Sequence, residues 1–287
     1  MHPAKQIVIT GIPEISAIYF ALLQCGYDYY SIERNKDHND ALQHFMGVED
    51  ASPFFSGTKQ NTCEVYPYWP RAAILETASF YLSPDHSQFQ SYDRFRRDIM
   101  SSGNIADCER DKALWKWIEG FPAAISGILS SDAFSSYLRW EKNWIKALNV
   151  QYETELQMIQ SCLDVCMSKY GSQVEDIQIV VSPIKCVYSA DYHLIENRFI
   201  FTSGKFTAHA VIHEFLHHVV HPVIKEIKGC ILRNKQLYPG LDNTYYLSGD
   251  DAGHLNAFEE YAVRKLTNDI LTQNYPASLS SYLVELA

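Results

Sequence analysis

The spacing of apolar residues predicts a long helix in the middle of the chain. Between Ser131 and Tyr170, apolar residues recur every three or four positions, which places them on one face of a helix. Only Glu141 interrupts this series, and Asn149 marks a point where the helix could kink. An apolar face of this length has to be covered, so we expect the helix to pack against the rest of the protein.

The remainder of the first half also has mainly helical patterns. Pro13 is placed to begin one helix, because proline is favoured in the first helical turn. Pro70 precedes a second predicted helix, Arg71–Leu82, which Ser83 and Pro84 should end. No repeat, low-complexity tract or clear linker interrupts this half.

The pattern changes to β-strands after Gly171. The segments Ile177–Val181 and Arg198–Thr202 are rich in the β-branched residues that strands favour, and Pro183 and Gly204 should end them. We expect the second strand to lie at a sheet edge along a cleft, antiparallel to bound substrate. An extended peptide can add to such an edge as a further strand.

The segment after these strands carries the clearest chemistry. Residues 208–220 have the apolar pattern of a buried helix and contain the sequence HEFLH, a complete HExxH motif. Residues four apart share one helix face, so His213 and His217 can bind one metal ion. Glu214 lies beside that ion, where it can take a proton from bound water as a general base. Pro222 is expected to end the helix.

Two histidines are too few, because a catalytic zinc usually has three protein ligands and one water. The metzincin pattern would need glycine three residues and histidine six residues after His217, where this chain has valines, so that class is excluded. A later segment with helical periodicity, 255–266, offers Glu259 and Glu260 instead. Periodicity slightly favours Glu259, whereas Glu260 lies one turn before Arg264, which could hold a ligating carboxylate.

These motifs resemble those of the gluzincin branch of the zincin metallopeptidases. More closely, the segment HEFxHxxVxP, beginning at His213, and the later E-x-x-V-R, beginning at Glu260, resemble an uncharacterised bacterial family of zinc peptidases. The resemblance also covers the strand before Pro183 and, more weakly, the region from Glu14 to Phe45. It implies a zincin-like catalytic region.

In that resemblance Glu260 is the third ligand, in preference to Glu259. The expected site is then one Zn²⁺ per chain, held by His213, His217 and Glu260, with Glu214 as the catalytic base. The implied activity is that of a zinc metallohydrolase, a peptidase acting on a peptide or protein substrate. Two alternatives stay open: a zinc amidohydrolase acting on a non-peptide or cell-wall amide, and a non-catalytic interaction protein with structural zinc.

Other residues near the motif are candidates for lesser roles. An amide hydrolase needs a hydrogen-bond donor for its oxyanion, and the candidates are Tyr245, Tyr246, His254 and Arg264. We expect His209 near the cleft mouth and His221 as a cap at the helix end, where the helix dipole favours it. His218 should point away from the ligand face.

The composition narrows the class of protein. The 287 residues carry a net charge of −10, which argues against nucleic acid and anionic membrane surfaces as partners. There is no apolar run of 18 or more residues to span a membrane, and the first residues lack a signal-peptide pattern. Seven cysteines without regular spacing indicate a reducing compartment, so we expect a cytoplasmic protein. The oligomeric state is not predicted.

Together these patterns predict a mainly helical α+β protein. We expect a helical N-terminal region, 1–171, and a zincin-like metal-binding region, 172–287, with a small mixed sheet and the HExxH helix. Because no linker separates them, they should form one compact body with the cleft between them. The segment 225–253 is rich in turn signals and should be an irregular insert before the helix that carries the glutamates.

Overall fold

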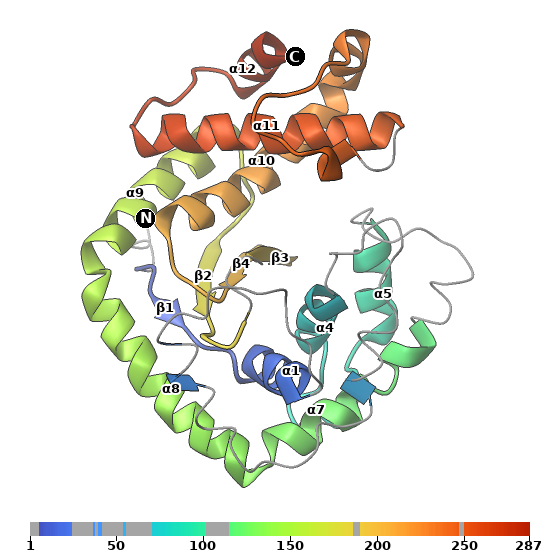
Figure 1. The fold of residues 1–287 in the computed structure, drawn as a ribbon, viewed down its shortest axis with the longest axis vertical. Helices are drawn as coiled ribbons and strands as arrows, with labels where there is room; N and C mark the ends of the chain where they lie inside the picture. The colour runs from blue at the N-terminus through green and yellow to red at the C-terminus, as the bar shows by residue number, and fades with distance from the viewer. Residues whose placement is uncertain are drawn as a thin grey trace.

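Helices surround a small sheet in the computed structural model of this chain, which describes residues 6–24, 37, 40–41, 54–55, 71–101, 115–185, 190–246 and 250–287. The main helices are α1 (Pro13–Gln24), α4 (Arg71–Ser79), α5 (Tyr92–Ser101), α7 (Phe121–Leu129), α8 (Asp132–Gln151), α9 (Glu153–Tyr170), α10 (Ala208–Ile231), α11 (Asp251–Leu271) and α12 (Leu279–Leu286) (Figure 1). Two short 3-10 helices, η2 (Leu232–Asn234) and η3 (Asn243–Tyr246), join α10 to α11. The predicted mainly helical α+β class is confirmed. Within these ranges, no helix combines the length and apolar character that a membrane span requires.

The sheet is mixed and has the strand order β1-β2-β4-β3. Its strands are β1 (Ile9–Thr10), β2 (Asp176–Val181), β3 (Asp191–Ile195) and β4 (Arg198–Ser203). Strand β2 pairs in parallel with both β1 and β4, and β3 pairs antiparallel with β4. Strands β2 and β4 confirm the two predicted segments, whereas β1 and β3 were not predicted.

The predicted position of the second strand is wrong. Strand β4 lies inside the sheet between β2 and β3, so β3 forms the edge within the described residues. The chain passes from β3 to β4 through a two-residue turn in which Glu196 has a φ of 58°. The short hairpin therefore adds β3 on the outside of β4, and β3 takes the edge position that we had expected for Arg198–Thr202.

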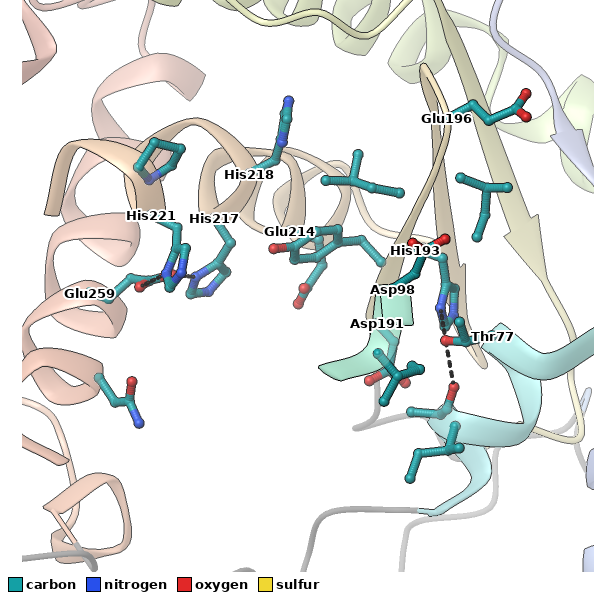
Figure 2. Close-up of a pocket in the computed structure, with 18 of the residues that line it drawn as sticks. Thr77, Asp98, Asp191, His193, Glu196, Glu214, His217, His218, His221 and Glu259 are labelled. Carbon is teal, nitrogen blue, oxygen red and sulfur yellow. Dashed lines mark hydrogen bonds and ion pairs between the residues drawn. The ribbon is translucent and has the colours of Figure 1, made fainter. Parts of the chain in front are cut away.

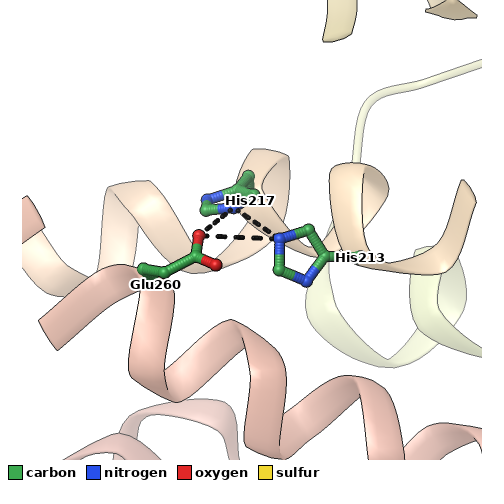
Figure 3. A group of neighbouring side chains, drawn as sticks. All are labelled: His213, His217 and Glu260. Carbon is green, nitrogen blue, oxygen red and sulfur yellow. Dashed lines mark hydrogen bonds and ion pairs between the residues drawn. The ribbon is translucent and has the colours of Figure 1, made fainter. Parts of the chain in front are cut away.

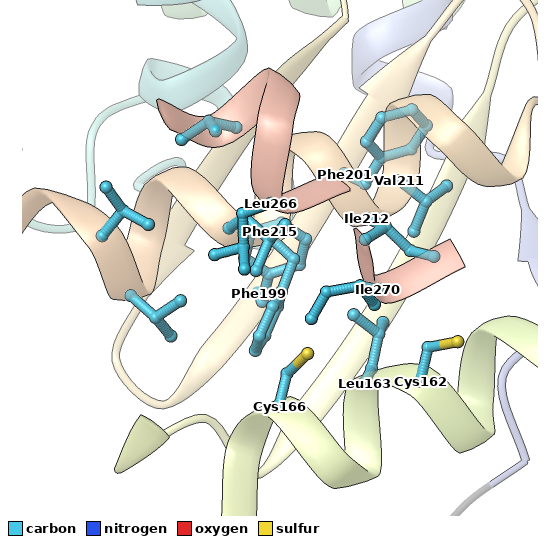
Figure 4. Packing of buried hydrophobic residues seen from close by; sticks show 14 of the residues in the cluster. Cys162, Leu163, Cys166, Phe199, Phe201, Val211, Ile212, Phe215, Leu266 and Ile270 are labelled. Carbon is cyan, nitrogen blue, oxygen red and sulfur yellow. The ribbon is translucent and has the colours of Figure 1, made fainter. Parts of the chain in front are cut away.

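The two faces of the sheet lie in two hydrophobic clusters. Neighbouring residues of a strand point to opposite faces. Ile179 and Phe201 belong to the cluster with α9, α10 and α11, and Figure 4 shows Phe201 in it. Val180 and Ile200, on the other face, pack with α1, α4 and α7. Both clusters combine residues from before and after Gly171. Separate folding of the two regions is not tested by these contacts, and the boundary stays a prediction.

The predicted helix from Ser131 to Tyr170 is two helices, α8 and α9. The break falls at Tyr152, whose φ of −108° and ψ of 21° are not helical. Asn149, the expected kink, lies one turn earlier and binds both backbone groups of Ile9, at 2.9 Å through Oδ1 and 2.8 Å through Nδ2. Asn149 therefore attaches β1 to α8. Helix α4 likewise ends at Ser79, before the expected end of that helix.

Helix α10 continues well beyond the HExxH motif. It runs through Pro222 to Ile231, so the prediction that Pro222 ends it is wrong. A proline inside a helix removes a backbone hydrogen bond and costs about 3 kcal/mol. Of the residues after it, Ile224 and Ile231 are buried in the core, and this packing offsets that cost. Residues 225–231 are therefore helical, and the predicted irregular insert is limited to the chain between α10 and α11.

Candidate metal centre

Two imidazoles of α10 and one carboxylate of α11 converge where these helices pack together (Figure 3). Nε2 of His213 lies 3.2 Å from Nε2 of His217. Oε2 of Glu260 lies 3.6 Å from the first nitrogen and 3.4 Å from the second. Among the described residues, these three form the one group of His, Cys, Asp or Glu ligand atoms that lie within 4.8 Å of one another. The structure thus brings together the three predicted ligands.

The spacing of these atoms fits a tetrahedral zinc ion. Bonds of about 2.0–2.2 Å at tetrahedral angles separate ligand atoms by roughly 3.3–3.6 Å. The three distances here, 3.2, 3.4 and 3.6 Å, span that range. Nδ1 of His213 is buried without a hydrogen-bond partner in the described part of the chain. Its Nε2 is therefore the nitrogen with polar neighbours, and these are the other members of the group.

Glu259 lies on the opposite side of the second histidine. Its Oε1 is 2.9 Å from Nδ1 of His217, and its Oε2 is 2.7 Å from Nδ1 of His221 (Figure 2). When Nδ1 of His217 donates to Glu259, its Nε2 keeps a lone pair for a metal. Glu259 thus orients the ring of His217, whereas the carboxylate of Glu260 converges with Nε2 of His213 and of His217. His221 lies inside α10 and contacts Glu259, so its predicted role as a helix cap is wrong.

The cluster favours ionised carboxylates beside a positive charge. Burial raises the pKa of Glu260, but hydrogen bonds with His213 and His217 outweigh it and hold this pKa well below its usual range. Burial acts likewise on Glu259, where hydrogen bonds with His217 and His221 lower the pKa to about 2. Burial lowers the pKa of His217, but the two carboxylates raise it to about 10. The charge that they attract can be supplied by a proton or by a metal dication.

Glu214 faces a cavity of about 900 Å³. Burial raises the pKa of Glu214 to about 8, His217 opposes this, and Asp191 adds to it. A dication on the neighbouring ligands would lower this pKa again. Helices α10 and α11 line one side of the cavity, and strand β3 with parts of α4 and α5 lines the other (Figure 2). The HExxH glutamate and the edge strand therefore border the same space.

Arg264 holds the carboxylate of Glu260 in place. Its Nε donates to Oε1 of Glu260 at 2.6 Å, so Oε2 is left to face the histidines. Its Nη2 donates to the hydroxyl of Tyr245 at 2.9 Å, and its Nη1 to the carbonyl of Gly240 at 2.9 Å. Tyr245 also lines the cavity. Of the four predicted oxyanion donors, Tyr245 is thus in a suitable place, while Arg264 is engaged with the ligand.

The other two predicted donors, Tyr246 and His254, do not line the cavity. The hydroxyl of Tyr246 accepts a hydrogen bond from the backbone N–H of Tyr238 at 2.8 Å. His254 is buried, and its Nε2 lies 3.5 Å from the hydroxyl of Tyr238. Neither is among the residues that line the cavity, so these side chains support the chain between α10 and α11.

Two further histidines of α10 lie on either side of the motif. His209 stacks on His213, with ring centroids 5.9 Å apart, but is not among the residues that line the cavity. The expected position of His209 at the cleft mouth is therefore not seen in this cavity. Nε2 of His218 lies 3.1 Å from the hydroxyl of Ser172, just after α9, so His218 points away from the ligands as predicted.

Comparison of this chain with family models, curated proteins and solved structures finds no match. The resemblance to the gluzincins therefore stays a prediction from sequence motifs, and support for a function has to come from the site geometry.

A second polar cluster lies at the opposite wall of the cavity, and sequence reasoning missed it. Nζ of Lys185, which is fully buried, bonds Oε1 of Glu76 at 2.6 Å, Oδ2 of Asp191 at 2.7 Å and Oγ1 of Thr202 at 2.8 Å. Nε2 of His193 lies 2.8 Å from Oε2 of Glu76. Burial raises the pKa of Glu76, but the charge of Lys185 and the hydrogen bond with His193 hold it well below its usual range.

The members of this cluster come from α4, β3, β4 and the segment after β2. Thr202 and Glu76 are 126 residues apart in sequence and yet 2.7 Å apart in space. No local spacing can indicate such an arrangement. The one signal in the sequence is the presence of polar residues, Asp191 and His193, within a short segment that also contains strand-forming residues.

Proposed function

We propose that this protein is a zinc-dependent hydrolase that cleaves peptide bonds. The observation that carries the proposal is the spacing of His213 Nε2, His217 Nε2 and Glu260 Oε2, which fits a tetrahedral zinc ion, beside the half-buried carboxylate of Glu214 that lines the cavity. A zinc ion with these three protein ligands would have its fourth coordination position open for water, as catalytic zinc sites do.

A bound zinc ion would polarise the scissile carbonyl and lower the pKa of its water towards ~7. The residues of the chain divide the remaining work. Glu214 takes the proton from the attacking water and passes it to the leaving amine. Glu259 orients His217, and Arg264 holds Glu260. Each of the three carboxylates thus has a separate task.

Tyr245 is suited to stabilise the oxyanion. Its hydroxyl accepts a hydrogen bond from Arg264, so its own proton is free for donation into the cavity. Burial and the charge of Glu260 raise the pKa of this hydroxyl, which keeps it protonated at neutral pH. A fixed donor of this kind stabilises the negative charge that develops on the carbonyl oxygen.

The edge strand favours a peptide over other amides as the substrate. A strand paired on one side has N–H and C=O groups free on the other at alternate residues, and an extended peptide can pair with them. Strand β3 borders the cavity along its whole length and runs antiparallel to β4. The substrate role that we expected for Arg198–Thr202 therefore passes to Asp191–Ile195. A non-peptide amide would have no use for this edge.

The test compares zinc content and cleavage in the wild-type protein and in Glu214→Gln. Peptide pools are incubated with each protein, and products are identified by mass spectrometry. The variant should retain zinc but lose cleavage by several orders of magnitude, because an amide cannot accept the water proton. Glu226→Gln, an exposed position on the same helix, is the matched control and should cleave like the wild type. Zinc-loaded wild-type protein that cleaves no peptide would overturn the proposal.

A further inference from the structure

The cluster around Lys185 has one carboxylate that reaches the cavity. The side chains of Lys185 and Glu76 are 0% exposed, whereas that of Asp191 is 23% exposed and lines the cavity. Oδ2 of Asp191 is held by Lys185 at 2.7 Å. Its other oxygen, Oδ1, has no hydrogen-bond partner among the described residues. Asp191 thus presents one open acceptor to the same space as Glu214.

The charges of this cluster leave a negative excess at that point. Lys185 supplies one positive charge between the two carboxylates of Glu76 and Asp191, so the three together carry one net negative charge. His193 contacts Glu76, which is fully buried, and therefore acts on the far end of the cluster. Because Glu76 and Lys185 are fully buried, only the carboxylate of Asp191 can contact a ligand in the cavity and attract it with this negative charge.

The anchoring of Asp191 also prepares it for binding. A buried ammonium that makes three hydrogen bonds fixes the carboxylate in one position. Binding usually costs the conformational entropy of the side chain that holds the ligand. Asp191 has already lost this entropy on folding, so its part in binding costs less. Of the Lys and Arg residues that line the cavity, Arg94 is paired with Glu196 at 3.1 Å, and Lys225 extends from α10 on the other side. Neither makes an ion pair with Asp191 in the described structure.

We propose that Asp191 binds a cationic group of the substrate and makes the site selective for peptides with a positive charge near the scissile bond. The proposal rests on the function proposed above for the cavity. The cation is an ammonium or guanidinium group, which a free peptide N-terminus or a Lys or Arg side chain can supply. Asp191 is the first residue of the edge strand, so a peptide paired with β3 would bring one of these groups beside it.

Binding of small probes tests this without turnover. Leucine amide is compared with 4-methylpentanamide, which lacks only the α-amino group. N-acetyl-lysine amide is compared with N-acetyl-norleucine amide, which lacks the side-chain ammonium. In calorimetric titrations of the wild-type protein, one charged probe should bind about tenfold to a hundredfold more tightly than its neutral counterpart, as expected for a hydrogen bond between charged groups. If the leucine amide pair shows this gain in affinity, the cation is a peptide N-terminus. If the N-acetyl-lysine amide pair shows it, the cation is a basic side chain.

Two variants test whether Asp191 is responsible for the gain in affinity of the charged probe. Asp191→Asn should abolish it, because the amide keeps the shape but loses the charge. Asp98→Asn is the matched control: it removes a carboxylate from the same cavity wall, one that already accepts a hydrogen bond from Tyr81, and should keep the gain. If Asp191→Asn does not fold, the triple variant Glu76→Gln, Lys185→Met and Asp191→Asn removes all three charges of the cluster, so no buried charge is left unpaired, and it should likewise show no preference for the charged probe.

The outcomes separate this inference from the proposed function. Equal binding of charged and neutral probes to the wild type, or a gain that survives in Asp191→Asn, overturns the role of Asp191 even if peptides are cleaved. A gain that depends on Asp191 supports the role even if no peptide is cleaved, because the titration requires no catalysis.

Discussion

Two groups of charged side chains border one cavity, and they balance their charges differently. On α10 and α11, His213, His217 and Glu260 point their ligand atoms at a common centre that no Lys or Arg side chain of the described structure occupies. At the opposite wall, Lys185 lies between Glu76 and Asp191, so the chain itself supplies the cation. The first group therefore has room for a metal, whereas the centre of the second is already filled by the ammonium of Lys185. Metal removal should affect the first group alone.

The largest expected effect separates the two neighbouring glutamates. Glu260→Ala removes a carboxylate from the tetrahedral group, so most of the zinc affinity should be lost. Glu259→Ala leaves all three ligand atoms and removes only the partner of His217, so the loss should be about 10–100-fold. Competition titrations with a zinc chelator measure both. Equal losses, or a larger loss in Glu259→Ala, would mean that the two roles have been assigned the wrong way round.

The second prediction concerns the stability of the opposite wall. Lys185→Met leaves Glu76 and Asp191 without their ammonium, and breaking a buried pair in this way costs about 3–5 kcal/mol. Urea unfolding of the metal-free proteins measures the loss. Lys225→Met, at an exposed position of α10, should change the free energy of unfolding little. An unchanged free energy in Lys185→Met would show that its ion pairs are not what holds α4 to the sheet.

The same comparison explains how far sequence alone could go. The HExxH histidines lie four residues apart, so their convergence follows from helix geometry alone. Strands β2 and β4 were predicted because their strand-forming residues are contiguous. The choice between Glu259 and Glu260 depends on how α10 and α11 pack, which periodicity cannot give. The cluster around Lys185 joins four elements and had no local pattern at all.

Errors at element ends have a related cause. Pro222 is a valid local signal for a helix end, but packing of the later turns around Ile224 and Ile231 outweighs it. Strand β3 was missed because Asp191 and His193 are polar, and their partners, Lys185 and Glu76, are supplied by other elements. In both cases tertiary contacts changed what the local residues would otherwise form.

The third prediction uses pH to compare the metal-free and zinc-loaded protein. The pKa of His217 is about 10 in the folded metal-free chain, against 6.5 as its ordinary value. A raised pKa stabilises the fold fully below the unfolded value, and this stabilisation is lost as the pH rises through the folded value. The metal-free protein should therefore lose stability between about pH 6.5 and 10.

Zinc should remove this dependence, because the metal replaces the proton on His217. Urea unfolding near pH 6.5 and pH 9.5, with zinc or with a chelator, measures the difference. Zinc binding near pH 7.5 should also release about one proton from His217, which calorimetry in buffers of different ionisation enthalpy detects. Identical pH profiles with and without zinc would contradict the assignment of His217 as a ligand.

The smallest expected effect concerns the outer end of the metal cluster. Nδ1 of His221 holds Oε2 of Glu259 at 2.7 Å, but the side chain of His221 is 42% exposed. An exposed pair contributes about 0–1 kcal/mol, so His221→Ala should weaken zinc binding by at most about fivefold. His218→Ala removes a histidine from the same helix that contacts Ser172 instead of Glu259, and it serves as the control. A loss as large as that of Glu259→Ala would mean that His221, and not His217 alone, fixes the position of Glu259.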